Sequence, residues 1–269
     1  MNKIILAFEF SEKSNSSLEF ALSIAEKTNN VLEIVWVDNI LDDLVEIEKE
    51  TIRQRYDEIL RSVVSQNYDR LPGGYLTYSI IIGDVCEALC EKVSFENADL
   101  IIIGTHSENK KLDTRWQHST ASKVAEKSKC AVMTVPVDCE YNELRNIVFP
   151  IDFDVSTLEK TVIVTYLAQR FKSHIYILAL QTSSEKTHIE KIKEYVNEVK
   201  TSFIDNQISC ELEYRNTNNL AKEIMSFSHE RKVDLVAVML HQETAVSNLI
   251  FGTYTHQLIL ESKVPLLIV

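Results

Sequence analysis

Two acidic residues that directly follow short apolar segments are the first candidates for a chemical role. Glu9 follows the apolar segment 4–8, and Asp152 follows the apolar segment 147–151. A carboxylate at the end of a strand can accept hydrogen bonds from a ligand, or from backbone N–H groups at the start of the next helix. The sequence leaves both roles open, ligand binding and helix capping.

Glycine, hydroxyl and histidine residues form a second candidate set, after apolar segments further along the chain. The set consists of Gly104, His106 and Ser119 in the first half, and of His241, Gln242, Gly252 and Thr253 in the second half. Gly with Ser or Thr before a helix leaves backbone N–H groups free to bind an anion such as phosphate. Ser119 and Thr253 could instead be plain helix caps, and a histidine after an apolar strand is more often a packed residue. No nucleophile, base and orienting group can be assembled from these residues, so we predict no enzymatic activity.

These residues recur at equivalent places because the chain repeats itself. With one constant offset, KIILAFEF at 3–10 aligns with NIVFPIDF at 146–153, so that Glu9 falls on Asp152. Two further pairs of segments match in order, namely ADLIIIGTH at 98–106 with VDLVAVMLH at 233–241, and KSKCAVMTV at 127–135 with ESKVPLLIV at 261–269. An internal repeat of this length indicates a duplicated domain. We predict one domain at 1–138 and a second at 143–269, with a linker around residues 138–144.

Each copy alternates apolar strands with amphipathic helices, and this alternation positions the candidate residues. Leu18, Ala21 and Ala25 recur at helical spacing, and second helices are predicted at about 41–66 and 187–204. A continuously apolar strand such as Leu100-Ile-Ile-Ile is typical of a parallel sheet covered by helices on both faces. The predicted fold class is therefore α/β, with two tandem doubly wound domains, each a five-stranded parallel sheet flanked by helices. Ligands of such sheets bind at the carboxyl ends of the strands, where Glu9 and Asp152 are expected.

Composition excludes several classes of protein. The net charge of −12 argues against nucleic-acid binding, which requires clustered Lys and Arg. No apolar run approaches the roughly 20 residues of a membrane span, and the amino-terminal run is too short for a signal peptide. The five cysteines do not form a disulfide pattern, and Cys86 and Cys90 are expected to be helix packing positions rather than a metal pair. We predict a cytoplasmic protein with no metal site.

Glycine is unusually scarce in this chain. Only five glycines are present, whereas average usage of about 7% would give roughly 19. A glycine-rich loop that wraps phosphate groups therefore cannot be built in both copies.

The spacing of the second candidate set resembles that of the universal stress protein (UspA-type) family, and the resemblance covers both copies. The family motif is G-x2-G-x9-G-(S/T) after the fourth strand, together with an acidic residue after the first. The second copy keeps this spacing as Met239, Gln242 and Gly252-Thr253. The first copy has Gly104 and Ser107, and its loop to His118-Ser119 is one residue longer. The resemblance implies an adenine nucleotide alpha hydrolase-like fold that holds ATP in the members that bind it.

The departures from this motif lead to two functional hypotheses. Four of the six motif glycines are replaced, and Met239 places a long side chain where backbone would approach a phosphate. The first hypothesis is a tandem universal stress protein that acts as a stress-response binding or interaction module, with degraded nucleotide-binding loops and no cofactor. The alternative is a sensor of adenine nucleotide, ATP or AMP, or a slow ATPase, that uses the second-domain pocket with Asp152, Gly252 and Thr253.

The last strand of each copy bears on assembly. Family members commonly dimerise through their last strands, so the resemblance implies an internal pseudo-dimer in which segments 131–135 and 265–269 pair. An uncovered apolar edge such as Leu266–Val269 would otherwise favour aggregation. The sequence leaves open whether two chains associate further as a homodimer, and it predicts neither a nucleic-acid nor a membrane partner.

Overall fold

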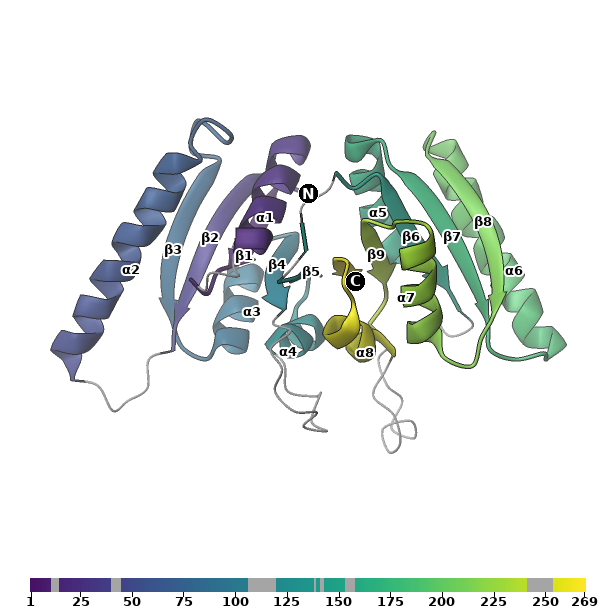
Figure 1. Cartoon of the computed structure of the whole chain (residues 1–269). Coiled ribbons are helices and arrows are strands. Elements are labelled where there is room, and N and C mark those ends of the chain that lie inside the picture. Colours follow the sequence, from purple (N-terminus) through teal and green to yellow (C-terminus); the bar gives the residue numbers. More distant parts are fainter. Residues whose placement is uncertain are drawn as a thin grey trace. The chain divides into compact units, whose positions relative to one another are not determined.

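The computed structural model divides the chain into two compact units, the first containing β1 to β5 and the second β6 to β10 (Figure 1). It describes residues 1–10, 15–39, 45–105, 120–137, 139–140, 143–152, 158–240 and 254–269. None of the described helices is both long and apolar enough to cross a membrane.

The first unit is a five-stranded parallel sheet with helices between its strands. In chain order its elements are β1 (Lys3–Ala7), α1 (Asn15–Thr28), β2 (Val31–Asp38), α2 (Glu46–Gln66), β3 (Leu76–Ile82), α3 (Val85–Glu96), β4 (Leu100–Thr105), α4 (Thr120–Lys127) and β5 (Ala131–Pro136). The strand order is β3-β2-β1-β4-β5. This order confirms the predicted doubly wound sheet, and it places the topological switch point between β1 and β4.

The central strands are buried on both faces, as their continuous apolar sequences predict. Ile4 pairs with Leu32 of β2 on one side and with Leu100 of β4 on the other. All four residues of Leu100–Ile103 are buried, although their side chains point alternately to the two faces. Helices therefore cover both faces, and only the ends of these strands can present a site.

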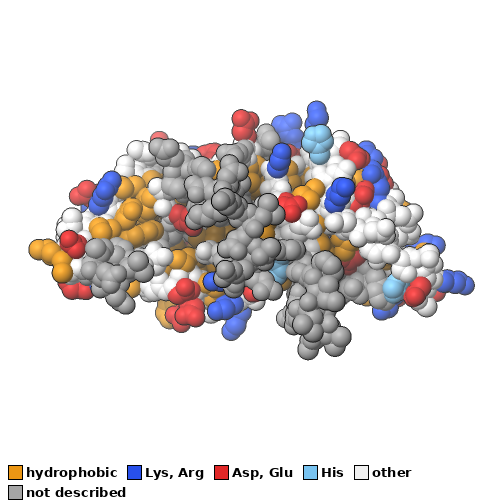
Figure 2. Space-filling model, turned by 60° about the horizontal axis from the view of Figure 1, so that its bottom comes forward, with side chains coloured by type: hydrophobic (Ala, Val, Ile, Leu, Met, Phe, Trp, Pro, Cys, Tyr) orange, Lys and Arg blue, Asp and Glu red, His pale blue; other side chains and the backbone are white. Residues whose placement is uncertain are grey.

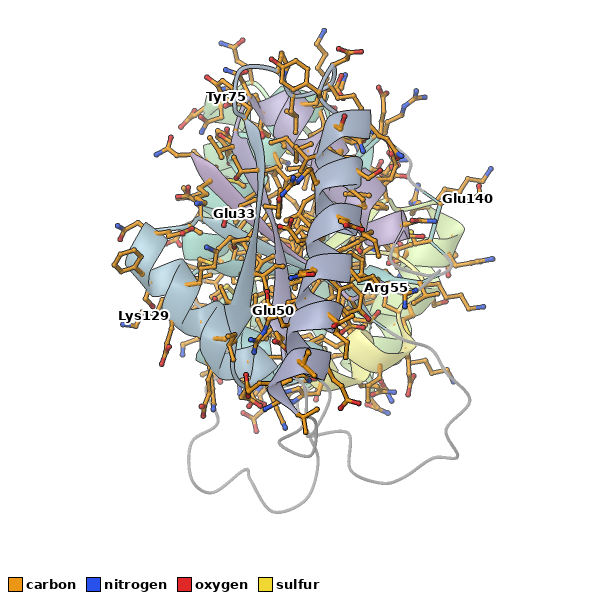
Figure 3. The ribbon with its side chains drawn as sticks, turned by 90° about the vertical axis from the view of Figure 1, so that its left-hand side faces the viewer. Glu33, Glu50, Arg55, Tyr75, Lys129 and Glu140 are labelled. Atoms are coloured by element: carbon orange, nitrogen blue, oxygen red, sulfur yellow. The ribbon has the colours of Figure 1, made fainter. Side chains whose placement is uncertain are left out.

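Helices α2 and α3 cover opposite faces of the sheet at the edge formed by β3. Figure 3 shows α2, which carries Glu50 and Arg55, on one side of β3 and α3 on the other. Helix α1 packs against β1, β4 and β5. Its buried face is wider than predicted, because Phe20 and Ile24 are buried whereas Leu18 is only half-buried. Contacts with several strands at once require more than a single apolar stripe.

A network of charges joins α3 to the sheet near the start of β1. Glu33 of β2 is 6% exposed and lies 2.6 Å from Lys3 Nζ and 2.8 Å from Lys92 Nζ. Burial alone raises the pKa of Glu33, but hydrogen bonds from Lys3 and Lys92 outweigh burial and lower this pKa to about 2. Figure 3 labels Glu33 on the side of the sheet that α3 covers.

The second unit repeats the architecture of the first. In chain order its elements are β6 (Asn146–Ile151), α5 (Leu158–Phe171), β7 (His174–Gln181), α6 (Lys186–Asp205), β8 (Ser209–Asn216), α7 (Leu220–Glu230), β9 (Leu235–Val238), α8 (Tyr254–Glu261) and β10 (Leu266–Ile268). Its strand order, β10-β9-β6-β7-β8, mirrors that of the first unit. All the pairings that the structure describes in this unit are parallel.

The predicted spans of the second helix in each unit differ in accuracy. Helix α6 agrees with the predicted span 187–204 to within one residue at each end. Helix α2 begins at Glu46 rather than near residue 41, because Val45 has an extended backbone and its N–H donates to the Glu48 carboxylate. The alternation of acidic and apolar residues before Val45 extended the prediction too far.

Candidate functional site

The carboxyl ends of β1, β2 and β4 surround a cavity in the first unit. We call this the strand-end cavity; it has a volume of about 240 Å³ and is lined by Ala7, Phe8, Glu9, Val35, Trp36, Val37, Asn39, Val85 and Ile103. The lining is mixed, with apolar side chains beside the Glu9 carboxylate and the Asn39 amide. Pockets for drug-sized ligands usually measure about 300–1,000 Å³. The volume enclosed by the described residues is below this range.

Aromatic residues pack together beside this cavity. Phe10 stacks on Tyr56 of α2 with ring centroids 4.6 Å apart, and Trp36 lies 4.2 Å from the same ring. Phe10 also contacts Phe8 edge-on at 5.0 Å. These rings contribute apolar burial and favourable ring geometry, and they attach α2 to the ends of β1 and β2.

Phe10 has an unusual backbone conformation. Its φ is 56°, in the left-handed region that bulky residues rarely adopt. The other described non-glycine residues with positive φ lie at or just beyond the ends of helices, where this conformation commonly terminates a helix. The strain at Phe10 is therefore held by its aromatic neighbours, and strain of this kind concentrates at functional sites.

A second attachment of α2 lies at the end of β2. Arg53 Nε donates to the buried Asp38 carboxylate at 2.6 Å. This pair fixes the first half of α2 to the end of β2, next to Trp36 and Val37 in the wall of the strand-end cavity. The ring contacts of Tyr56 and the Arg53–Asp38 pair are both tertiary, and neither follows from a local sequence pattern.

Gly104 lies at the carboxyl end of β4, above the start of α1. A Cβ added at this position would lie 3.7 Å from Ser17 Oγ, which is an ordinary contact, and the φ of Gly104 is outside the left-handed region. The backbone therefore does not require glycine at this first motif position. Ser17, which is buried, accounts for the close approach of helix and strand.

The equivalent place in the second unit contains an internal charge. The offset that aligns Glu9 with Asp152 also aligns Ser17 with Lys160. Lys160 is 1% exposed, and its ammonium donates to the Pro150 carbonyl at 2.7 Å. Burial lowers the pKa of Lys160 to about 7, against the opposing attraction of Asp152. Asp152 is itself buried, at 7% exposure, so its surroundings differ from those of the exposed Glu9.

Met239, at the first motif position of the second unit, directly follows β9. Its carbonyl accepts a hydrogen bond of 3.0 Å from Thr255 Oγ1, in the first turn of α8. This bond connects the end of β9 to the start of α8 and uses the Thr255 hydroxyl internally. The proton of this hydroxyl is therefore donated within the protein.

Three of the predicted site residues, Glu9, Gly104 and Asp152, belong to the described part of the chain. All three stand at the carboxyl ends of the central strands, as predicted. Six others lie outside the described residues, namely His106, Ser119, His241, Gln242, Gly252 and Thr253. The segments 11–14 and 153–157, on which the helix-capping alternative depends, also lie outside them.

Lys160, Trp36 and Asn39 are site residues that the sequence analysis missed. A signal for Lys160 was present, because a lysine stands where the first copy has the small residue Ser17. Trp36 and Asn39 carry no comparable signal, since tertiary packing alone places them in the cavity wall.

Among the described residues, neither the cysteine thiols nor metal-ligating side chains form a second candidate site. No group of three or more His, Cys, Asp or Glu side chains there could hold a metal ion. Burial raises the pKa of Cys90 to about 12, and it also raises the pKa of Cys86. Protonated thiols of this kind are poor nucleophiles and poor metal ligands.

Comparison with known proteins identifies one family in both units. The family model described as universal stress protein family matches residues 1–136 and 143–269. A universal stress protein from Archaeoglobus fulgidus has a similar structure, with a TM-score of 0.73 at 17% identity over 99% of this chain and 95% of that one. A universal stress protein from Pseudomonas aeruginosa gives a TM-score of 0.70 at 13% identity, over 100% of this chain and 93% of that one. At these identities the likeness shows the fold alone. Among curated proteins, no sequence matches the chain significantly.

Proposed function

Because the chain belongs to the universal stress protein family, we propose that it is a stress-response binding and interaction module with degraded nucleotide sites. The observation that most supports this proposal is the buried Lys160 beside Asp152. In the second unit, the acidic residue that would receive a ligand's hydrogen bonds has an ammonium group of the protein itself as its neighbour. We assign the module no catalytic activity, and we place it in the cytoplasm because its five cysteines are all free thiols.

Exposed apolar side chains at one end of the first unit support a role in interaction. Val45 and Ile47 at the start of α2 are 60% and 76% exposed, and Ile82 at the end of β3 is 67% exposed. Figure 2, which looks toward the carboxyl ends of the strands, shows hydrophobic side chains reaching the surface at the end where α2 lies. Grouped apolar exposure of this kind is typical of protein contact surfaces.

Calorimetric titration of the full-length protein with ATP and magnesium tests the proposal. We expect no saturable binding in the micromolar range. Micromolar ATP binding that Asp152→Ala abolishes would overturn the proposal for the second unit. A Glu194→Ala variant, altered on the exposed face of α6, controls for unspecific effects.

An adenine-nucleotide sensor or slow ATPase is the second candidate function, which the motif spacing assigns to the second-domain pocket. The strand-end cavity favours the first unit instead, since it offers two aromatic residues, Phe8 and Trp36, and the Glu9 carboxylate. Mass spectrometry of co-purified ligand would support a sensor. Loss of that ligand in Glu9→Gln would place it in the first unit, whereas loss in Thr253→Arg would place it in the second.

A further inference from the structure

Lys160 requires a physical explanation, because a lysine ammonium is seldom removed from water. It lies in the first turn of α5, and among the described residues it is the one lysine that is buried. Burial of an ammonium is unfavourable by several kcal/mol unless other groups replace its hydration. The groups around Lys160 therefore indicate what this part of the second unit is built to hold.

Three kinds of group replace water around the ammonium. The Pro150 carbonyl accepts a hydrogen bond of 2.7 Å from Nζ. The face of Phe149 lies 4.0 Å from the same nitrogen, measured to the ring centroid, which is within the range of a cation–π interaction. Asp152 supplies a negative charge close enough to favour the charged amine. A carbonyl acceptor, an aromatic face and a carboxylate each interact favourably with a primary amine, but together they do not offset the burial of its charge, because the pKa of Lys160 is lowered to about 7.

The groups that surround the Lys160 amine belong to the end of one strand and not to α5, the helix that carries Lys160. Phe149 and Pro150 belong to β6, and Asp152 directly follows that strand. Phe149 and Pro150 pair with Ile177 and Leu178 of β7, and β9 pairs with β6 just before them, at Ile147 and Val148. The receiving groups would therefore remain in place if the lysine side chain were shortened.

We propose that the carboxyl end of β6 is a primary-amine binding site, and that the Lys160 side chain occupies it in cis. The class of ligand for the vacated site is a small primary alkylamine. The inference goes beyond the proposed function, because it assigns the second unit a ligand chemistry unrelated to phosphate. In the first unit the residues equivalent to Phe149, Asp152 and Lys160 are Leu6, the exposed Glu9 and Ser17, so this site is particular to the second unit.

Chemical rescue in the full-length protein tests this inference. Lys160→Ala removes the ammonium and leaves space for a short amine, whereas Lys160→Met removes the charge and keeps the space filled. We expect n-propylammonium to raise the thermal midpoint of Lys160→Ala saturably, with an effect at least threefold larger than on wild type or Lys160→Met. Neutral 1-propanol and tetramethylammonium should have no saturable effect, since neither presents an N–H donor.

Asp152 provides the matched control. In Lys160→Ala/Asp152→Asn the response to n-propylammonium should weaken at least tenfold, because the carboxylate is lost. If Lys160→Ala does not fold, refolding in n-propylammonium should recover it, and refolding in 1-propanol should not. Equal responses to the amine and the alcohol, or in the two Lys160 variants, would overturn the inference. ATP binding at Asp152 of the wild type would contradict the proposed function, whereas failure of amine rescue contradicts only this site.

Discussion

Single buried charges in the two units are stabilised to very different degrees. Glu33 receives hydrogen bonds from Lys3 and Lys92, and its pKa is lowered to about 2. Lys160 has one backbone acceptor and the attraction of Asp152, and burial still lowers its pKa to about 7. The two lysine partners of Glu33 outweigh the desolvation of its carboxylate. The groups around Lys160 do not outweigh the desolvation of the Lys160 ammonium.

Replacing Glu33 should destabilise the first unit and change its response to acid. A carboxyl group whose pKa is lower in the folded state stabilises the protein above the unfolded pKa, near 4.5. This stabilisation is lost as the pH falls toward about 2. We expect Glu33→Gln to lower the free energy of unfolding at pH 7 by about 3 kcal/mol, and to reduce the loss of stability between pH 4.5 and 2.

Tryptophan fluorescence during urea unfolding measures this effect, because Trp36 is buried in the first unit. Glu194→Gln on an exposed face of α6 serves as the control, with no expected change. A Glu33→Gln protein as stable as wild type at pH 7 would show that the network contributes nothing net.

Lys160 should make the stability of the second unit depend on alkaline pH. Its pKa rises from about 7 in the folded state to about 10.5 on unfolding, so the unfolded chain binds more protons between these values. The free energy of unfolding then increases with pH in this window, by up to about 1.4 kcal/mol per pH unit. In Lys160→Met this increase should be absent.

Circular dichroism during urea unfolding at pH 7.5 and 9.0 measures the difference between the two proteins. Lys193→Met, at an exposed position of α6, should keep the slope of the wild type. A constant difference between wild type and Lys160→Met at the two pH values would contradict the prediction.

At the level of elements, helix starts combine local and tertiary control. The Asp84 carboxylate accepts from the backbone N–H groups of Cys86 and Glu87 at 3.0 and 3.1 Å, and so caps α3. Asn219 caps the equivalent helix α7 through Lys222 N at 2.9 Å. These caps are local, whereas α2 is positioned through Arg53 and Tyr56, far along the chain from the strands that they contact.

The two caps should contribute similar stability to their units. We expect Asp84→Ala and Asn219→Ala each to lower the free energy of unfolding by about 1 kcal/mol, because backbone donors lose an acceptor. Asp84→Asn keeps an acceptor and should cost only a fraction of this. Hydrogen exchange of the first turns of α3 and α7 measures the effect, and unchanged exchange in the alanine variants would contradict the assignment of the caps.

At the level of the whole molecule, we propose that the two units form the internal pseudo-dimer that the family resemblance implies. The proposed contact uses the segments 131–135 and 265–269, whose apolar sequences would be an aggregation hazard if uncovered.

Separate expression of residues 1–138 and 143–269 tests the pseudo-dimer. We expect the two polypeptides to form a one-to-one complex when mixed, and each alone to self-associate through its last strand. Size-exclusion chromatography with light scattering measures both. Two halves that remain monomeric, alone and mixed, would contradict the proposal.

The sequence by itself determined the duplication, the alternation of strands and helices, and the placement of Glu9, Gly104 and Asp152 at strand ends. These features are local, since a strand covered on both faces is continuously apolar and an amphipathic helix repeats every 3.6 residues. The repeat then transfers each assignment from one copy to the other.

Only the tertiary structure decided which charges are internal and how the two strand-end sites differ. The motif spacing favours the second-domain pocket with Asp152 for nucleotide binding, but Asp152 lies beside the buried Lys160, whereas Glu9 borders a cavity. Whether a side chain is buried depends on what packs over it from distant parts of the chain. The spacing of a motif does not contain this information, and neither does its match to a family.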